Sequence, residues 1–290
     1  MLFPGKSVIL QNILRRPLVK KIAYFILSIV VLSSCSEYEK LLKSGDATLK
    51  YDKAMEYYEK EQYTKALTLI EQILPVYKGT EKSEKLNYVH AMCYYKLKDY
   101  ILASHYFQSF TRDYTNSRYQ EEAEYLMAYC FYKLSPRTSL DQANTYNAIE
   151  ALRIYLRKYP SSEKADECRL LLSEMEEKLV KKAYDSAVLY YNLREYKSAI
   201  VALRDALRNH PTSKYREEML FLLLKSNYLL AVNSVADKQQ DRYQNTIDEY
   251  YTFIYEYPQS KYIREAEQIF EQSRVRLTDK SKLEKDITNK

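Results

Sequence analysis

The pattern of apolar and polar positions repeats along the chain with one fixed spacing. The small residues Ala54, Ala91 and Ala128 lie 37 residues apart, and each is followed three positions later by an aromatic residue, Tyr57, Tyr94 or Phe131. Ala187 and Tyr190 form the same pair further on. A fixed period of this length indicates a chain built from repeated structural units.

A second alanine and a stop signal complete each unit. The second alanines are Ala66, Ala103 and Ala199, twelve residues after the first, whereas Ala148 follows Ala128 by twenty and marks an eight-residue insertion. The stops are Tyr114-Thr115-Asn116-Ser117, Tyr159-Pro160-Ser161-Ser162, His210-Pro211-Thr212-Ser213 and Tyr257-Pro258-Gln259-Ser260. Proline ends a helix, and the serine two residues later can cap the next one. Each unit therefore reads as helix, short turn, helix and stop.

This arrangement resembles the tetratricopeptide repeat, which places a small residue, an aromatic, an alanine, a bulky residue and a proline in order. In the second repeat these positions hold Ala91, Tyr94, Ala103, Phe107 and Thr115. The match is strong over residues 46–212 and weaker beyond, where a polar insertion spans residues 237–241 and the fifth repeat is irregular. We expect an all-α fold, a tetratricopeptide-repeat superhelix of about five helix-turn-helix repeats.

The spacing breaks once, and this break predicts how the chain divides. Ala128 and Ala187 are 59 residues apart, so a long helix is expected at 163–192, in which Lys164 to Leu179 join the third and fourth repeats, as one bent helix or as two. The predicted parts are an N-terminal arm at 35–160 with repeats 1 to 3 and a C-terminal arm at 161–277 with repeats 4 and 5. The polar tail at 278–290 is expected to be disordered.

The first 34 residues are predicted to be a lipoprotein signal peptide. Basic residues precede an apolar run from Ile22 to Leu32, which is too short to span a bilayer and ends at Leu32-Ser33-Ser34-Cys35. This ending resembles the lipobox of bacterial lipoproteins, in which the cysteine is acylated and becomes the first residue. We predict that Cys35 carries the lipid that anchors the chain in the bilayer; an ordinary secretory signal is the alternative.

Charge and composition argue against a nucleic-acid-binding protein and favour a helical one. The net charge of +6 includes five basic residues and no acid before Cys35, so the mature chain has 40 basic and 39 acidic side chains and no electrostatic basis for binding nucleic acid. After removal of the signal only two glycines and five prolines remain, which favours long helices.

No combination of residues suggests a reaction or a metal site. Cys93, Cys130 and Cys168 are widely spaced, so neither disulfides nor zinc are expected, and Cys93 and Cys130 suit small-residue packing at one repeat position. Phosphate-binding loops, nucleophile elbows and metal-binding histidine pairs are lacking. We expect no enzyme, and no cofactor apart from the lipid on Cys35. His90 is interpreted as a packing or surface residue, and Lys178, Lys181 and Lys182 as a solvated helix face.

Tyrosine is the informative excess, with 32 residues and no tryptophan. Tyrosines recur three residues before and four residues after the first alanine, and positions seven apart share one helix face. We expect those of the N-terminal repeats to line a concave, peptide-binding groove with two lysines that meet a carboxylate. Packing between neighbouring helices is the alternative role. The predicted residues are Tyr51, Tyr58, Tyr88, Tyr95, Tyr125, Tyr132, Lys96 and Lys133.

From the lipobox cysteine to about Phe270 the chain resembles the BamD family, lipoproteins of the outer-membrane β-barrel assembly machinery. The resemblance rests on Cys35, the five repeats, the joint after the third, and the stretch from Ala187 through Ala199 to His210-Pro211. It implies a non-enzymatic scaffold on the periplasmic face of the outer membrane that binds the periplasmic domains of BamA and unfolded outer-membrane proteins.

The resemblance also assigns roles to the two arms, docking of BamA to the C-terminal arm and contact with clients to the N-terminal arm. The repeat by itself indicates only a protein-binding scaffold. Another tetratricopeptide-repeat lipoprotein of the cell envelope, an envelope coordinator or a glycan-uptake partner, is the alternative.

Overall fold

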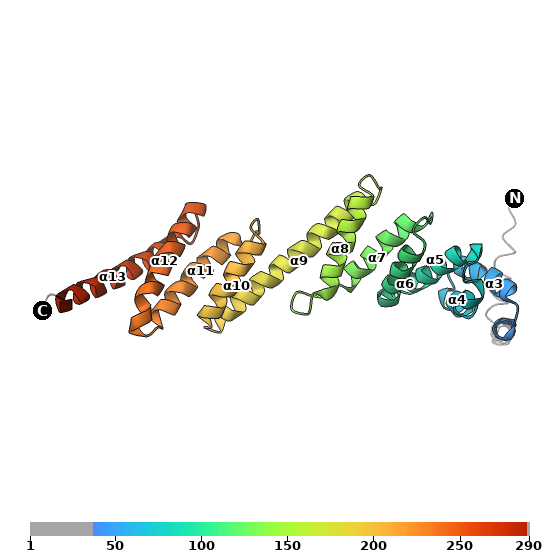
Figure 1. Ribbon diagram of the computed structural model, residues 1–290, viewed down its shortest axis with the longest axis horizontal. Helices are drawn as coiled ribbons and strands as arrows, with labels where there is room; N and C mark the ends of the chain where they lie inside the picture. Colours follow the sequence, from blue (N-terminus) through green and yellow to red (C-terminus); the bar gives the residue numbers. More distant parts are fainter. Residues whose placement is uncertain (1–36, 289–290) are drawn as a thin grey trace, which may run out of the picture. The chain divides into compact units, whose positions relative to one another are not determined.

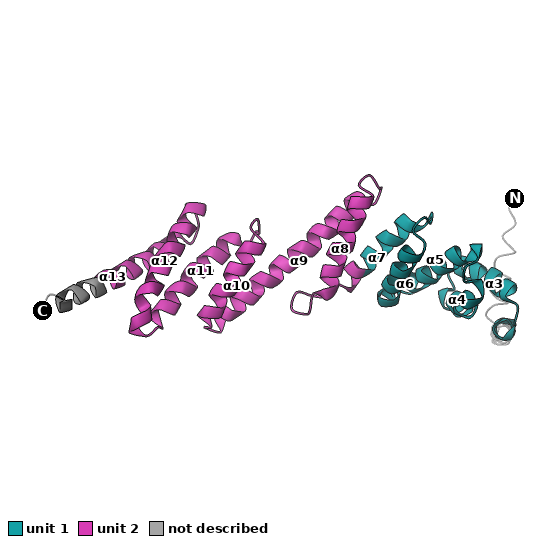
Figure 2. Ribbon diagram, viewed as in Figure 1, with its two compact units in different colours: residues 1–130 teal, residues 131–290 magenta. Residues whose placement is uncertain are grey.

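The computed structural model describes the backbone of residues 37–288 and the side chains of residues 37–278. Within these residues the regular secondary structure is helical and no strand occurs, so the predicted all-α tetratricopeptide-repeat fold is confirmed. The chain forms two compact units, residues 1–130 and residues 131–290 (Figure 2). Their boundary lies 30 residues before the predicted division between the arms.

Unit 1 consists of antiparallel helix pairs (Figure 1). After a short helix at 37–43 come α3 (Ala47–Glu59), α4 (Tyr63–Tyr77), α5 (Glu81–Lys96), α6 (Tyr100–Asp113) and the larger part of α7 (Gln120–Leu134). The recurring alanines of the first two repeats, Ala54, Ala66, Ala91 and Ala103, are fully buried. Side chains this small allow the paired helices to approach closely, as the sequence pattern predicted.

Unit 2 continues the pairs but has longer helices. It contains α8 (Ala143–Lys158), α9 (Ala165–Asn192), α10 (Tyr196–Asn209), α11 (Arg216–Val232), α12 (Ala236–Glu256) and α13 (Ile263–Thr288). The joint between the third and fourth repeats is the single 28-residue helix α9. The polar residues 237–241 form the first turns of α12.

The polar tail, for which the sequence predicts disorder, has a helical backbone over most of its length. The backbone from residue 278 continues α13 as far as Thr288 instead of ending at the polar residues. The last described side chains that pack in this helix include Ala266, Ile269 and Ser273, all buried. A helix already fixed by such packing can be extended at little further cost, because each added residue contributes one backbone hydrogen bond.

The turns repeat as closely as the helices do. Glu61, Lys98 and Arg194 occupy the same place between paired helices and have positive φ angles of 58°, 62° and 62°. The predicted serines Ser117, Ser162, Ser213 and Ser260 each accept a hydrogen bond from the backbone amide two residues later, just before the next helix. These bonds satisfy amides that the first helical turn leaves without partners.

The eight-residue insertion is a structured loop at 135–142. Lys178 donates to Ser135 Oγ at 2.8 Å, and Lys182 donates to the carbonyl oxygens of Thr138 and Leu140 at 3.1 and 2.6 Å. The interpretation of Lys178 and Lys182 as solvated was therefore wrong. The sequence pattern could not predict these bonds, because their partners are more than 40 residues apart in sequence. These bonds attach the loop to the middle of α9.

Candidate peptide-binding surface

The tyrosines three residues before the repeat alanine are mostly hidden from solvent. Tyr51, Tyr88 and Tyr125 are exposed by at most 9%. Tyr88 stacks on Tyr119 with ring centroids 4.3 Å apart and also packs against Phe107 and Phe110. Burial and the nearby Glu122 carboxylate raise the pKa of Tyr88. These rings belong to the core and offer little surface to a ligand.

Their stacking partners form a motif that the sequence interpretation missed. Tyr88 stacks on Tyr119, Tyr184 on Tyr215, and Phe221 on Tyr262, with centroids 4.3 to 4.5 Å apart. Each partner closes a Ser-Arg-Tyr or Ser-Lys-Tyr triplet just before the next repeat. In the first repeat Lys82 takes that place, and its Nζ lies 4.5 Å from the Tyr51 ring centroid. The triplet recurs at 117–119, 213–215 and 260–262, and this recurrence could have predicted the stacked partners from the sequence.

The tyrosines four residues after the alanine remain partly exposed. Tyr58 packs edge-on against Tyr63 at 5.7 Å, and Tyr95 against Tyr100 at 6.1 Å. Burial raises the pKa of Tyr58 to about 12. In unit 2, Tyr132 is half-buried and donates to Glu174 Oε2 at 3.0 Å. Of the predicted tyrosines, a ligand would reach these three more readily.

The two predicted lysines are exposed at the ends of their helices. Lys96 ends α5, and Lys133 lies in the last turn of α7 with its Nζ 5.4 Å from the Tyr132 ring centroid. Cations at helix C-termini are favoured by the helix dipole, so part of their placement has a structural cause. Tyr58, Tyr95 and Lys96 lie in unit 1, whereas Tyr132 and Lys133 lie in unit 2.

The remaining candidate chemical groups are buried. Cys93, Cys130 and Cys168 are free thiols without solvent exposure, and burial raises their pKa to about 12, 12 and 11. Thiols held in this state are poor nucleophiles. Among the described side chains, no three His, Cys, Asp or Glu residues are placed to hold a metal ion.

The comparison with protein families identifies the chain. The model of an outer membrane lipoprotein family, YfiO, matches residues 44–241 and again 181–282. The chain belongs to this family. The two matches together span both compact units, and the family name agrees with the repeat pattern and the lipobox found in the sequence.

A single curated relative matches a shorter part of the chain than the family model does. The outer membrane protein assembly factor BamD of Caulobacter vibrioides is 28% identical over 98 residues, which are 34% of this chain and 32% of that protein. The chain thus aligns with about a third of this relative's length.

Solved structures with tetratricopeptide repeats show only a loose similarity. The P58(IPK) domain matches with a TM-score of 0.39 at 16% identity, over 84% of this chain and 68% of that one. A Bacteroides fragilis repeat protein matches with a TM-score of 0.38 at 13% identity, over 80% and 99%. At such scores the fold assignment rests on the chain's own helix pairs.

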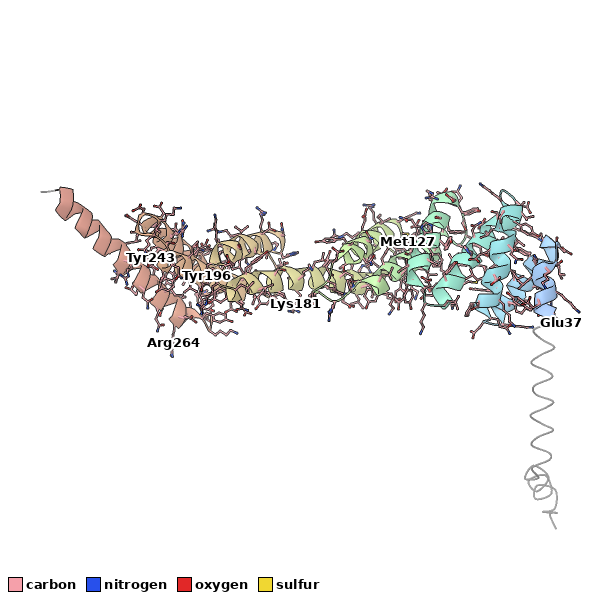
Figure 3. All side chains as sticks on the ribbon, turned by 90° about the horizontal axis from the view of Figure 1, so that it is seen from below. Glu37, Met127, Lys181, Tyr196, Tyr243 and Arg264 are labelled. Carbon is pink, nitrogen blue, oxygen red and sulfur yellow. The ribbon has the colours of Figure 1, made fainter. Side chains whose placement is uncertain are left out.

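Membrane attachment concerns the segment before the helices. Of the helices described, none has the length and apolar content needed to cross a bilayer. The predicted lipid site, Cys35, and the predicted signal peptide lie outside the described residues, which begin at Glu37, labelled in Figure 3.

Proposed function

We propose that this protein is a lipid-anchored scaffold of the machinery that assembles β-barrel proteins in the outer membrane. It would be anchored through Cys35 on the periplasmic face, bind the periplasmic domains of BamA, and receive unfolded outer-membrane proteins. The observation that carries the proposal is the family match across residues 44–282. The 98-residue similarity to an assembly factor supports it.

The architecture suits a scaffold. Stacked helix pairs present extended surfaces in which each repeat contacts mainly its neighbours, and such surfaces bind other proteins. The C-terminal repeats are proposed to dock BamA and the N-terminal repeats to contact clients. A coordinator or a glycan-uptake lipoprotein of the envelope would share the anchor and the fold, so the partner decides between these functions.

Purification of the full chain with a C-terminal tag from detergent-solubilised envelopes tests the proposal. We expect BamA to co-purify in near-stoichiometric amount and to be absent from the eluate of a tagged, unrelated outer-membrane lipoprotein. Recovery of a glycan transporter without BamA would support the alternative and contradict the proposed function.

For client binding we propose the part-exposed tyrosines. Extended segments with alternating aromatics, such as the C-terminal strands of barrel proteins, would stack on Tyr58 and Tyr95 while their carboxylate meets Lys96. Truncating an aromatic anchor typically costs about 1 to 2 kcal/mol of binding free energy. Replacing Tyr58 and Tyr95 together by alanine should therefore weaken binding of a client C-terminal peptide by roughly tenfold or more.

Fluorescence anisotropy with the labelled peptide measures this effect. The matched control is Tyr146→Ala, because Tyr146 is an exposed tyrosine of α8 outside the predicted set. Circular dichroism would confirm that all variants keep their helix content. Unchanged affinity in a folded double variant would leave these tyrosines with a packing role only.

A further inference from the structure

The helix α9 is covered along one face by two successive neighbours, and the cover ends before the helix does. Its first half packs against α8, where Met175 meets Ala148 and Ile149. Its middle is bonded to the 135–142 loop by Lys178 and Lys182. In helical order the same ridge continues through Ser186, Leu189 and Leu193. Lys181 and Tyr196, labelled in Figure 3, bracket this last segment.

The last two turns of this ridge are apolar and exposed. Leu189 is 56% exposed and Leu193 61%, and the adjacent Tyr190 is also exposed. The adjacent turn of the helix carries no further large apolar side chain that is exposed, so Leu189, Tyr190 and Leu193 form the apolar surface. Large apolar side chains that cluster on a surface in this way are typical of an interaction site.

The repeat pattern shows what normally covers this position. Leu189 stands two residues after the small residue Ala187, and the corresponding residues of repeats two, three and five are Cys93, Cys130 and Ser226. All three are 0% exposed. Cys93 lies beside Tyr58 and Tyr63 of the preceding helix pair. In a regular repeat, therefore, the preceding helix pair covers this position.

The first repeat has a charged residue at this position. Its corresponding residue is Glu56, which is solvated and forms ion pairs with Lys53 and Lys60. Terminal repeats of a solenoid carry such polar outer faces because they remain in water. The fourth repeat instead has the apolar Leu189 at this position, followed by Tyr190. Leu193 corresponds to Leu97 of the second repeat, which is also exposed, so Leu189 is the residue that departs from the pattern.

The second repeat also indicates which side chains the covering helix contributes. There the covering helix α4 brings Glu71 to within 2.7 Å of the Tyr94 hydroxyl and 3.8 Å of His90 Nε2. Tyr190 corresponds to Tyr94, and its hydroxyl bonds to no described residue. The segment that follows, residues 194–197, carries Arg194, Glu195 and Lys197, a net charge of +1, and the exposed Arg194 and Lys197 form no ion pair with a described residue.

We propose that the last turns of α9 and its C-cap, residues 186–193, bind an amphipathic helix of another protein. The apolar ridge of that helix would cover Leu189 and Leu193, and an acidic residue on its rim would meet Tyr190, Arg194 and Lys197. The occupant would thus pack as α4 packs on α5 in this same chain. The proposal goes beyond the proposed function, because it holds for any partner that carries such a helix.

The probe for this site is a peptide with the sequence of α4, residues 63–77, labelled with fluorescein and stapled on its outer face. The staple is needed because an isolated helix of this length is marginal in water. Anisotropy titration with the full mature protein in detergent micelles should give saturable binding. Exchange of Glu71 for lysine in the peptide should weaken it at least threefold.

The decisive variant is the double substitution Leu189→Glu with Leu193→Glu, which leaves the core intact because both side chains are exposed. It should weaken peptide binding at least tenfold, while Leu170→Glu, at an even more exposed leucine in the first half of α9, should not. Failure of the wild type to bind, or equal binding by the double variant, would overturn the proposal. The proposal would also be overturned if light scattering showed a wild-type dimer that is absent from the double variant, because a second copy of this chain would then cover Leu189 and Leu193.

Discussion

Replacing Tyr88 by alanine is expected to lower the free energy of unfolding by about 3 kcal/mol, the cost typical of removing a large buried aromatic side chain. The ring is 7% exposed and is enclosed by Tyr119, Phe107 and Phe110. Removing it would leave a cavity between two successive repeats. Urea denaturation followed by circular dichroism measures the loss.

The control is Tyr88→Phe, which keeps the stacked ring and removes only the hydroxyl near Glu122. It should cost roughly 1 kcal/mol, the usual net contribution of one hydrogen bond. Tyr146→Ala, at an exposed ring, should stay within about 0.5 kcal/mol of the wild type. If Tyr88→Ala lost less than about 1 kcal/mol, the stacked pair would not stabilise the repeats.

Replacing Cys35 by alanine is expected to abolish membrane anchoring. Each buried methylene of an acyl chain contributes about 0.8 kcal/mol, and stable attachment needs more than one chain. Without the thiol that accepts these chains, the protein should appear as an unprocessed precursor or in the soluble fraction. Membrane fractionation and mass measurement of the N-terminal peptide would show either form.

The matched control is Cys168→Ala, which removes a buried thiol and should leave the membrane fraction unchanged. Mass spectrometry also tests the wild type directly. Detection of an unmodified Cys35 on membrane-bound protein would refute the lipid assignment and favour an ordinary secretory signal.

The helix pairs could be predicted because their signals are local. The alanines, the following aromatics and the capping serines each act within one or two turns, so a period of 37 residues suffices to place them. The tyrosine positions were found in the same way. Their exposure was not, because periodicity places Tyr51 and Tyr58 on one helix face without saying which neighbouring ring covers either of them.

The sequence by itself determined the repeat, the turns and the stops, because short-range sterics and capping decide them. Only the tertiary structure decided that α9 is one helix, that Lys178 and Lys182 bind a loop more than 40 residues away, and that Tyr88 is core. It alone showed Leu189 exposed where Cys93 is buried. The physical reason is that burial depends on which helix lies alongside, and residues distant in sequence supply that helix.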